Sequence, residues 1–147
     1  YILLVMNNTT ATATAKRFNK GDAVTLIESW DNKGTFIFQH WTVYASGKQQ
    51  ITLVGPDGFA KRRVLAHDDR LVARFATDAE TVAHGIAMAA EFLAGEKRSW
   101  DAVIDRAYAQ GEGNSESTDR LRRGRANDIA AFHAPECVSR ETAEARI

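Results

Sequence analysis

The chain has 147 residues, of which 44% are hydrophobic and 26% are charged, the composition of an ordinary soluble globular domain. Nineteen basic and nineteen acidic side chains cancel, so the sequence lacks the basic excess typical of a dedicated nucleic-acid binder. A single cysteine, Cys137, excludes a framework of internal disulfides and favours a cytoplasmic, reducing environment.

Residues 1–15 show no apolar periodicity and predict a flexible leader. Tyr1–Val5 is apolar but far too short to span a membrane, and it lacks the basic flank of a secretory signal. Two interpretations of this short run stay open. It is either a remnant ahead of a start at Met6 or an additional edge strand.

Residues 20–75 predict five short strands in up-and-down order, separated by turns. Asp31-Asn32-Lys33-Gly34 and Gly55-Pro56-Asp57-Gly58 carry the residues that tight turns favour. The β-branched and aromatic residues between the turns predict the strands Ala23–Trp30, Thr35–Ala45, Gln50–Val54, Phe59–Ala66 and Leu71–Phe75.

The second of these strands changes its apolar parity midway. Phe36 and Phe38 lie on one face of a regular strand, whereas Trp41 and Val43 lie on the other. If all four side chains enter one core, an extra residue must bulge out near Gln39-His40 and bend the strand. The alternative is a flat strand in a sheet covered on both faces, one of them by helices.

The motif Phe18-x-Lys20-Gly21-Asp22-x-Val24, followed by five short strands, resembles the opening of small SH3-like β-barrels. The resemblance covers the strand region only and implies a fold rather than a function. Such barrels commonly bind peptides, other proteins or nucleic acid, and they are seldom enzymes by themselves. The signature peptide-binding residues of SH3 domains are not recognisable in the chain, so the resemblance implies no peptide specificity.

A helical hairpin is expected after the strands. Thr77-Asp78-Ala79-Glu80 matches a capping box at a helix start, and Gly95 is typical of a helix end. A second helix is predicted over Trp100–Gln110, with Ser99 as its cap. The first helix is expected to bury the residues that recur at helical spacing, which are Val82, Ile86, Ala89 and Leu93.

Residues 111–147 predict a linker and a helical tail. Gly111–Ser117 has the composition of a linker, Asp119–Phe132 is a helix with few apolar residues, and Ser139 caps a last helical segment. The predicted organisation is a leader (1–15), one domain (16–110) and the tail (111–147). The predicted fold class is α+β: a five-stranded bent antiparallel sheet or SH3-like barrel, followed by a helical hairpin and a helical tail.

The strand region is basic and the hairpin is acidic. Residues 16–76 hold 10 basic and 6 acidic side chains, and residues 77–110 hold 3 and 6. The two parts are expected to neutralise each other. The alternative is a basic face that attracts phosphate.

The candidate partner-binding residues combine cations and aromatic side chains on the predicted strands. Lys61-Arg62-Arg63 is the densest cationic run, and two aromatic residues at strand ends are expected to be exposed. The commoner explanation of such a run is a solvated face or a protected sheet edge. The full candidate set is Lys61, Arg62, Arg63, Arg70, Arg74, Trp30 and Tyr44.

Two other groups contain residue types that perform chemistry. His67-Asp68-Asp69 joins an imidazole to carboxylates, but no further residue at a suitable spacing completes a catalytic site. His133 and Cys137 have a zinc-like spacing, but a structural zinc site needs four ligands and no second pair exists. We therefore expect neither a metal nor another cofactor.

The sequence favours a small cytoplasmic, non-catalytic binding protein that acts by protein–protein contact and does not contact membranes. A small sheet without motifs, together with an arginine-bearing tail, is typical of accessory proteins of phages and mobile elements. The alternative is a nucleic-acid-associated module that uses the basic face of the strand region. An enzyme that uses the His67-Asp68-Asp69 loop is the third interpretation.

Overall fold

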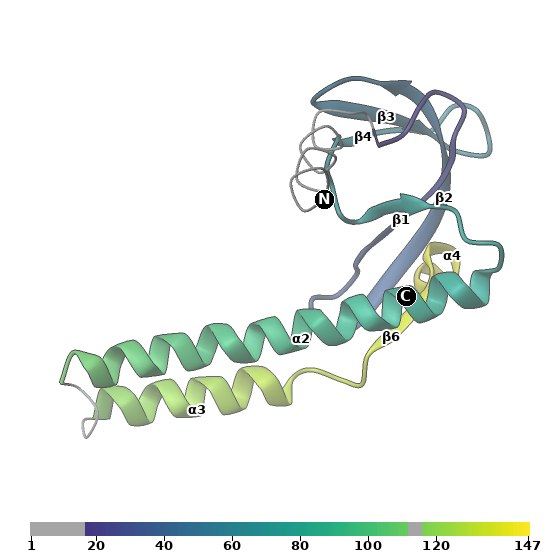
Figure 1. Cartoon of the computed structure of the whole chain (residues 1–147). Coiled ribbons are helices and arrows are strands. Elements are labelled where there is room, and N and C mark those ends of the chain that lie inside the picture. Colours follow the sequence, from purple (N-terminus) through teal and green to yellow (C-terminus); the bar gives the residue numbers. More distant parts are fainter. Residues whose placement is uncertain (1–16, 112–115) are drawn as a thin grey trace, which may run out of the picture. The chain divides into compact units, whose positions relative to one another are not determined.

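The fold is α+β, as the sequence predicts. Figure 1 shows the computed structural model, which describes residues 17–111 and 116–147. The helices are α2 (Asp78–Ala109), α3 (Glu116–Ala130) and α4 (Arg140–Ala145). The strands are β1 (Ala23–Ser29), β2 (Thr35–Ser46), β3 (Gln50–Val54), β4 (Lys61–Leu65), β5 (Leu71–Ala73) and β6 (Glu136–Ser139). The predicted leader and residues 112–115 of the predicted linker lie outside the described residues.

The five predicted strands form an open antiparallel sheet in the order β4-β3-β2-β1-β5. The barrel alternative is wrong, because closure requires the two end strands to pair. β5 has only three residues, and they pair with Val24–Leu26 of β1. In the described part of the chain β4 pairs with β3 alone. The sheet therefore keeps two ends.

The chain divides into two compact units, and β1 and β2 contribute residues to both. Of the described residues, the strand unit comprises 17–26 together with Gln39–Phe75. The helix unit comprises Ile27–Phe38 and Ala76–Ile147. The core of the strand unit consists of Phe18, Val24, Leu26, Trp41, Val43, Ile51, Leu53, Val64, Ala66 and Leu71.

This division explains the parity change in β2. Trp41 and Val43 belong to the core of the strand unit. Phe36 belongs to the helix unit, where its ring lies edge-on against Phe92 of α2 at a centroid distance of 6.0 Å. The aromatic residues of β2 thus serve two cores. The register shift of β2 against β3 lies between Val43 and Ala45, not near the predicted position at Gln39-His40.

The helix unit contains a strand that the sequence did not indicate. β6 lies within the predicted tail and pairs in parallel with the first part of β2, with Thr35 opposite Glu136 and Phe38 opposite Ser139. Cys137 of β6 is buried against α2, where a Cβ atom on Gly85 would lie 2.2 Å from its Sγ. The predicted tail therefore supplies part of the sheet.

The first helix begins as predicted but does not end at Gly95. The Thr77 hydroxyl accepts the Glu80 N–H at 3.2 Å, which confirms Thr77 as the helix cap, and it also donates to the Glu80 carboxylate. α2 then continues to Ala109. A glycine inside a helix costs about 1 kcal/mol relative to alanine, and packing of α3 along α2 offsets this cost. Figure 1 shows α2 and α3 side by side, so the helical hairpin consists of these two helices.

The buried face of α2 matches the predicted one only in part: Ala89 is buried as predicted. Ile86 is 39% exposed, whereas small residues occupy the buried positions. Thr81, Gly85 and Ala89 recur every four residues and bring the helix backbone close to β6. A search for large apolar residues misses such a face. No helix in the described ranges has the length and apolarity that crossing a membrane requires.

Candidate functional site

The candidate site lies on β2, β3 and β4 of the strand unit, and a tight turn positions β4. Gly58 has a φ of 78°, which favours glycine at this position. The Asp57 carboxylate accepts the Ala60 N–H at 3.0 Å and the Phe59 N–H at 2.9 Å. These hydrogen bonds lower the pKa of the Asp57 carboxyl group. The turn therefore fixes the point at which β4 begins.

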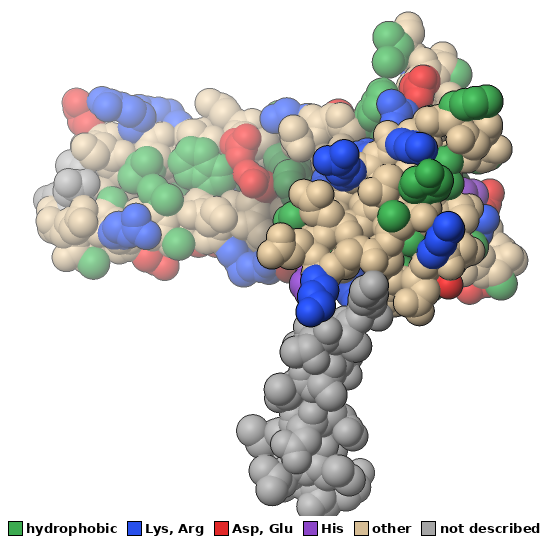
Figure 2. All heavy atoms as spheres, turned by 90° about the horizontal axis from the view of Figure 1, so that it is seen from above, with side chains coloured by type: hydrophobic (Ala, Val, Ile, Leu, Met, Phe, Trp, Pro, Cys, Tyr) green, Lys and Arg blue, Asp and Glu red, His purple; other side chains and the backbone are tan. Residues whose placement is uncertain are grey.

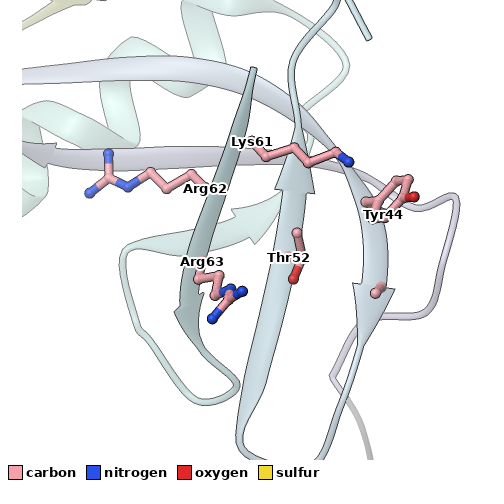
Figure 3. A pocket seen from close by; sticks show the side chains of 6 residues that line it. Tyr44, Thr52, Lys61, Arg62 and Arg63 are labelled. Carbon is pink, nitrogen blue, oxygen red and sulfur yellow. The ribbon is translucent and has the colours of Figure 1, made fainter. Parts of the chain in front are cut away.

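The residues of β4 alternate between the core and the outer face of the sheet. Val64 is buried, whereas Lys61, Arg63 and Leu65 are exposed on the other face. Figure 3 shows the Arg62 side chain extending away from those of Lys61 and Arg63. The strand thus presents two cations on its outer face.

A hollow of about 340 Å³ lies on this outer face and is called the β4 pocket below. Within it the Lys61 Nζ lies 4.3 Å from the centroid of the Tyr44 ring, a cation–π contact. Figure 3 shows Lys61 reaching across β3 towards Tyr44, with Thr52 on the strand between them. The lining residues are Tyr44, Ala45, Thr52, Lys61, Arg62 and Arg63.

The β4 pocket has the electrostatics of an anion site. Three of its lining residues are cationic and none is acidic. The aromatic ring holds the Lys61 ammonium without neutralising its charge, so the ammonium still attracts a carboxylate or a phosphate. Arg62 also interacts with Asp68, whose pKa it helps to lower. Lys61 and Arg63 are therefore the cations on which the site depends most.

Two large apolar side chains near the ends of β4 are exposed. Phe59, just before β4, is 87% exposed, and Leu65, the last residue of β4, is 65% exposed. In Figure 2, hydrophobic side chains and Lys or Arg side chains lie interspersed on the strand-bearing part of the molecule. Such a mixture of apolar and cationic side chains is typical of a contact surface rather than of a purely solvated one.

The other predicted site residues do not line the β4 pocket. Arg70 forms an ion pair with Asp68 at 2.6 Å. Arg74 donates hydrogen bonds to the carbonyl oxygens of Val24 at 3.3 Å and Trp41 at 2.6 Å, so its role is structural. Trp30 belongs to the helix unit. The prediction that Trp30 and Tyr44 are exposed is confirmed, at 38% and 48%.

Sequence reasoning missed four residues of this surface. Thr52 lies opposite Arg63 in the β3–β4 ladder, and Ala45 lies opposite Thr52 in the β2–β3 ladder. The predicted strand limits would place Val54 opposite Phe59, whereas the structure pairs Val54 with Lys61, so the sequence did not give the register that aligns these residues. Phe59 and Leu65 were assigned to a strand, but the sequence contains no signal that they are exposed.

The His67-Asp68-Asp69 loop uses its central carboxylate structurally. Hydrogen bonds from Arg70 outweigh burial and hold the pKa of the Asp68 carboxyl group below its ordinary value. Its backbone carbonyl accepts a hydrogen bond from Arg17 at 2.8 Å. Asp68 therefore holds the loop in place through its contacts with Arg70 and Arg17, and these contacts do not form a catalytic pair.

His133 belongs to a second polar cluster, which lies within the helix unit. Its Nε2 lies 2.8 Å from the Asp31 carboxylate and 3.1 Å from the Thr35 hydroxyl, and its Nδ1 lies 3.0 Å from the Ala134 carbonyl oxygen. The hydrogen bond to Asp31 and then that to Ala134 raise the pKa of His133. Burial opposes ionisation of Asp31, but hydrogen bonds from His133, Lys33 and Thr35 outweigh it and lower the pKa of this carboxyl group.

Cys137 does not share this cluster's polar environment. Burial and then the charge of Glu136 raise the pKa of its thiol to about 11, so the thiol stays protonated near neutral pH. Among the residues that the structure describes, no group of three or more His, Cys, Asp or Glu side chains is placed to hold a metal ion.

Comparisons of this chain with protein-family models, with curated proteins and with solved structures found no match. The geometry of the β4 pocket therefore carries the functional argument.

Proposed function

We propose that this chain is a non-catalytic binding protein that holds an acidic surface of another protein at the β4 pocket. The observation that carries the proposal is the pocket lining, which joins the outward-facing cations Lys61 and Arg63 to the exposed ring of Tyr44 and includes no carboxylate. Arginine and tyrosine are enriched among residues that dominate binding energy at protein interfaces. The exposed side chains of Phe59 and Leu65 add apolar area beside the charges.

A nucleic-acid-associated module is the second candidate, and one specific observation favours it. Cations beside an exposed aromatic ring on a sheet also describe a platform for single-stranded nucleic acid. The whole chain has no net charge, however, so its long-range attraction for a phosphate backbone is small. We therefore rank protein binding first.

A charge-reversal experiment tests the proposal. Lys61→Glu combined with Arg63→Glu replaces both outer cations of β4, and both side chains are exposed, so the fold should survive. The matched control combines Lys20→Glu with Lys48→Glu, which changes the net charge equally at exposed lysines outside the pocket lining. Thermal unfolding of both variants checks that each is folded.

Affinity capture from a lysate of the source cell, with mass spectrometry, provides the readout. Proteins retained by the wild type and by the control, but lost by the β4 variant, support the proposal. Retention of the same proteins by all three would contradict it. Labelled single- and double-stranded DNA and RNA are titrated in parallel at about 0.15 M salt. Submicromolar binding that the β4 variant loses would establish the second candidate instead.

A further inference from the structure

We propose that the free edge of β4 binds an extended acidic segment of the partner, which adds to the sheet as a strand with carboxylates opposite Lys61 and Arg63. This inference rests on the proposed function and narrows its partner to one backbone conformation and one charge pattern. Strand addition to an exposed sheet edge is a general mode of peptide recognition.

The backbone hydrogen bonds at the ends of β4 fix which of its N–H and C=O groups face β3. Hydrogen bonds from Gly55 to Ala60 at 2.8 Å and from Ala66 to Gln49 at 2.9 Å lie beyond the two ends of the β3–β4 ladder. Antiparallel strands alternate between hydrogen-bonded and non-hydrogen-bonded pairs. This alternation directs the N–H and C=O groups of residues 62 and 64 towards β3.

The same alternation directs the backbone groups of Lys61, Arg63 and Leu65 away from β3. β4 is an end strand of the sheet, and within the described ranges no strand lies on that side of it. Lys61 and Arg63 therefore present N–H and C=O groups at the spacing that another strand requires, and Leu65 adds its N–H. The Leu65 C=O accepts the Asp68 N–H at 3.1 Å, so the open row ends there. A sugar–phosphate backbone does not match such a row, so this geometry favours a polypeptide.

The side chains of β4 define the charge pattern that an added strand would meet. Residues directly opposite each other in an antiparallel pair lie close together, and opposite charges there are stabilising. The outer face of β4 presents Lys61, Arg63 and Leu65 in turn, and Phe59 precedes the strand. The complementary segment has an acidic residue opposite each cation and an apolar residue at either end, with any β-forming residue between these positions.

A second copy of β4 is a competing occupant of the edge. An antiparallel copy centred on Arg63 would place Arg63 opposite Arg63, and like charges at directly opposite positions are destabilising. Cations on an end strand are a common device against such self-pairing. The same cations attract an acidic strand, so the edge discriminates between the two occupants.

The probe is a synthetic peptide with capped ends and the sequence Ile-Thr-Glu-Thr-Glu-Thr-Ile, whose charge pattern reads the same in both directions. It is titrated up to about 1 mM into the full chain labelled with ¹⁵N. We expect saturable binding in which the amides of Lys61, Arg63 and Leu65 gain protection from hydrogen exchange. The amide of Val72, in β5 at the other end of the sheet, should not change.

Two comparisons separate the contributions of charge and backbone. Lys61→Glu with Arg63→Glu should weaken binding at least about tenfold, and Lys20→Glu with Lys48→Glu should not. Methylating the backbone nitrogens of both glutamates keeps their charge but removes the donors that face the carbonyl groups of residues 61 and 63. This change should also weaken binding at least about tenfold.

Each contrary result overturns a defined part of the proposal. Equal binding of the methylated and parent peptides would show that charge acts without strand addition. If the peptide did not bind but capture of proteins from the lysate still depended on Lys61 and Arg63, strand addition would be refuted and the proposed function would stand. If neither peptide binding nor lysate capture depended on Lys61 and Arg63, both the strand-addition mode and the proposed function would be refuted. Displacement of the peptide by oligo-dT at lower concentration would assign the edge to nucleic acid.

Discussion

Gly85→Ala is the sharpest test of how β6 is held against α2. A Cβ atom at this position would lie 2.2 Å from the Cys137 Sγ, 2.8 Å from the Cys137 Cβ and 3.4 Å from the Ile27 Cγ2. The first two distances are too short for any real contact. β6 cannot withdraw freely, because it is paired with β2 from Thr35↔Glu136 onwards.

The expected loss of stability follows from two opposing effects. Overpacking a close-packed interior costs about 3 kcal/mol when backbone must move. Alanine in a helix interior regains about 1 kcal/mol relative to glycine. Gly85→Ala should therefore lower the free energy of unfolding by about 2 kcal/mol, which corresponds to a fall in Tm of roughly 6 °C for a chain of this size.

Denaturant or thermal unfolding measures this loss, and thiol labelling of Cys137 reports locally. The variant should label faster, because the thiol is buried in the wild type. Adding Cys137→Ala removes the 2.2 Å clash but keeps the 2.8 Å one, so it should restore part of the stability.

Gly95→Ala is the matched control in the same helix. A Cβ atom there would meet only the Arg98 Nη2, at 3.6 Å, so this change should stabilise the protein by about 0.5–1 kcal/mol. If Gly85→Ala were as stable as the wild type, the close packing of β6 on α2 would be refuted.

Three further predictions concern the helix unit. The Asp31–His133 pair should stabilise the fold most between pH 3.8 and pH 6.5, the ordinary pKa values of the two groups. Its contribution to the free energy of unfolding is lost when the pH rises through the raised pKa of His133, and also when the pH drops through the lowered pKa of Asp31. NMR titration should show the His133 pKa above 6.5 and reduced by Asp31→Asn. Ala89→Asp, at a fully buried site, should cost several kcal/mol in chemical denaturation, whereas Ile86→Asp, at a site 39% exposed, should cost about 1 kcal/mol or less. Truncation after Gln110 removes β6 and should abolish the cooperative unfolding of the helix unit in calorimetry; an unchanged transition would show that β6 is dispensable.

Local chemistry made the strands and the helix cap predictable. Turn residues set the strand limits to within a few positions, and the Thr77–Glu80 capping box marks the start of α2. The end of α2 was not predictable from Gly95, because packing against α3 decides it. Trp100 donates a hydrogen bond to Asp128 at 2.8 Å and covers Gly124, and neither contact has a local sequence signal.

The candidate site was predictable only in part. Lys61, Arg63 and Tyr44 meet because the strand register brings them together. The sequence did not place the register shift between Val43 and Ala45, which is where Tyr44 lies. Arg74 and Trp30 carry suitable side chains but lie elsewhere, since side-chain type does not reveal which carbonyl oxygens or which unit a residue will contact. β6 was missed because four residues paired with a distant strand produce no periodicity.

The pairing of β6 with β2 also sets the order of events during synthesis of the protein. Side-chain bonds in this region join residues 98 and 102 positions apart. A ribosome that adds about 5–20 residues per second leaves β2 without this neighbour for roughly 5–20 s. During that time Phe36, Ile37 and Phe38 form an apolar strand segment with an unpaired edge, which is a target for chaperones and for aggregation. The yield of folded protein in a cell should therefore depend on translation speed and on chaperone supply.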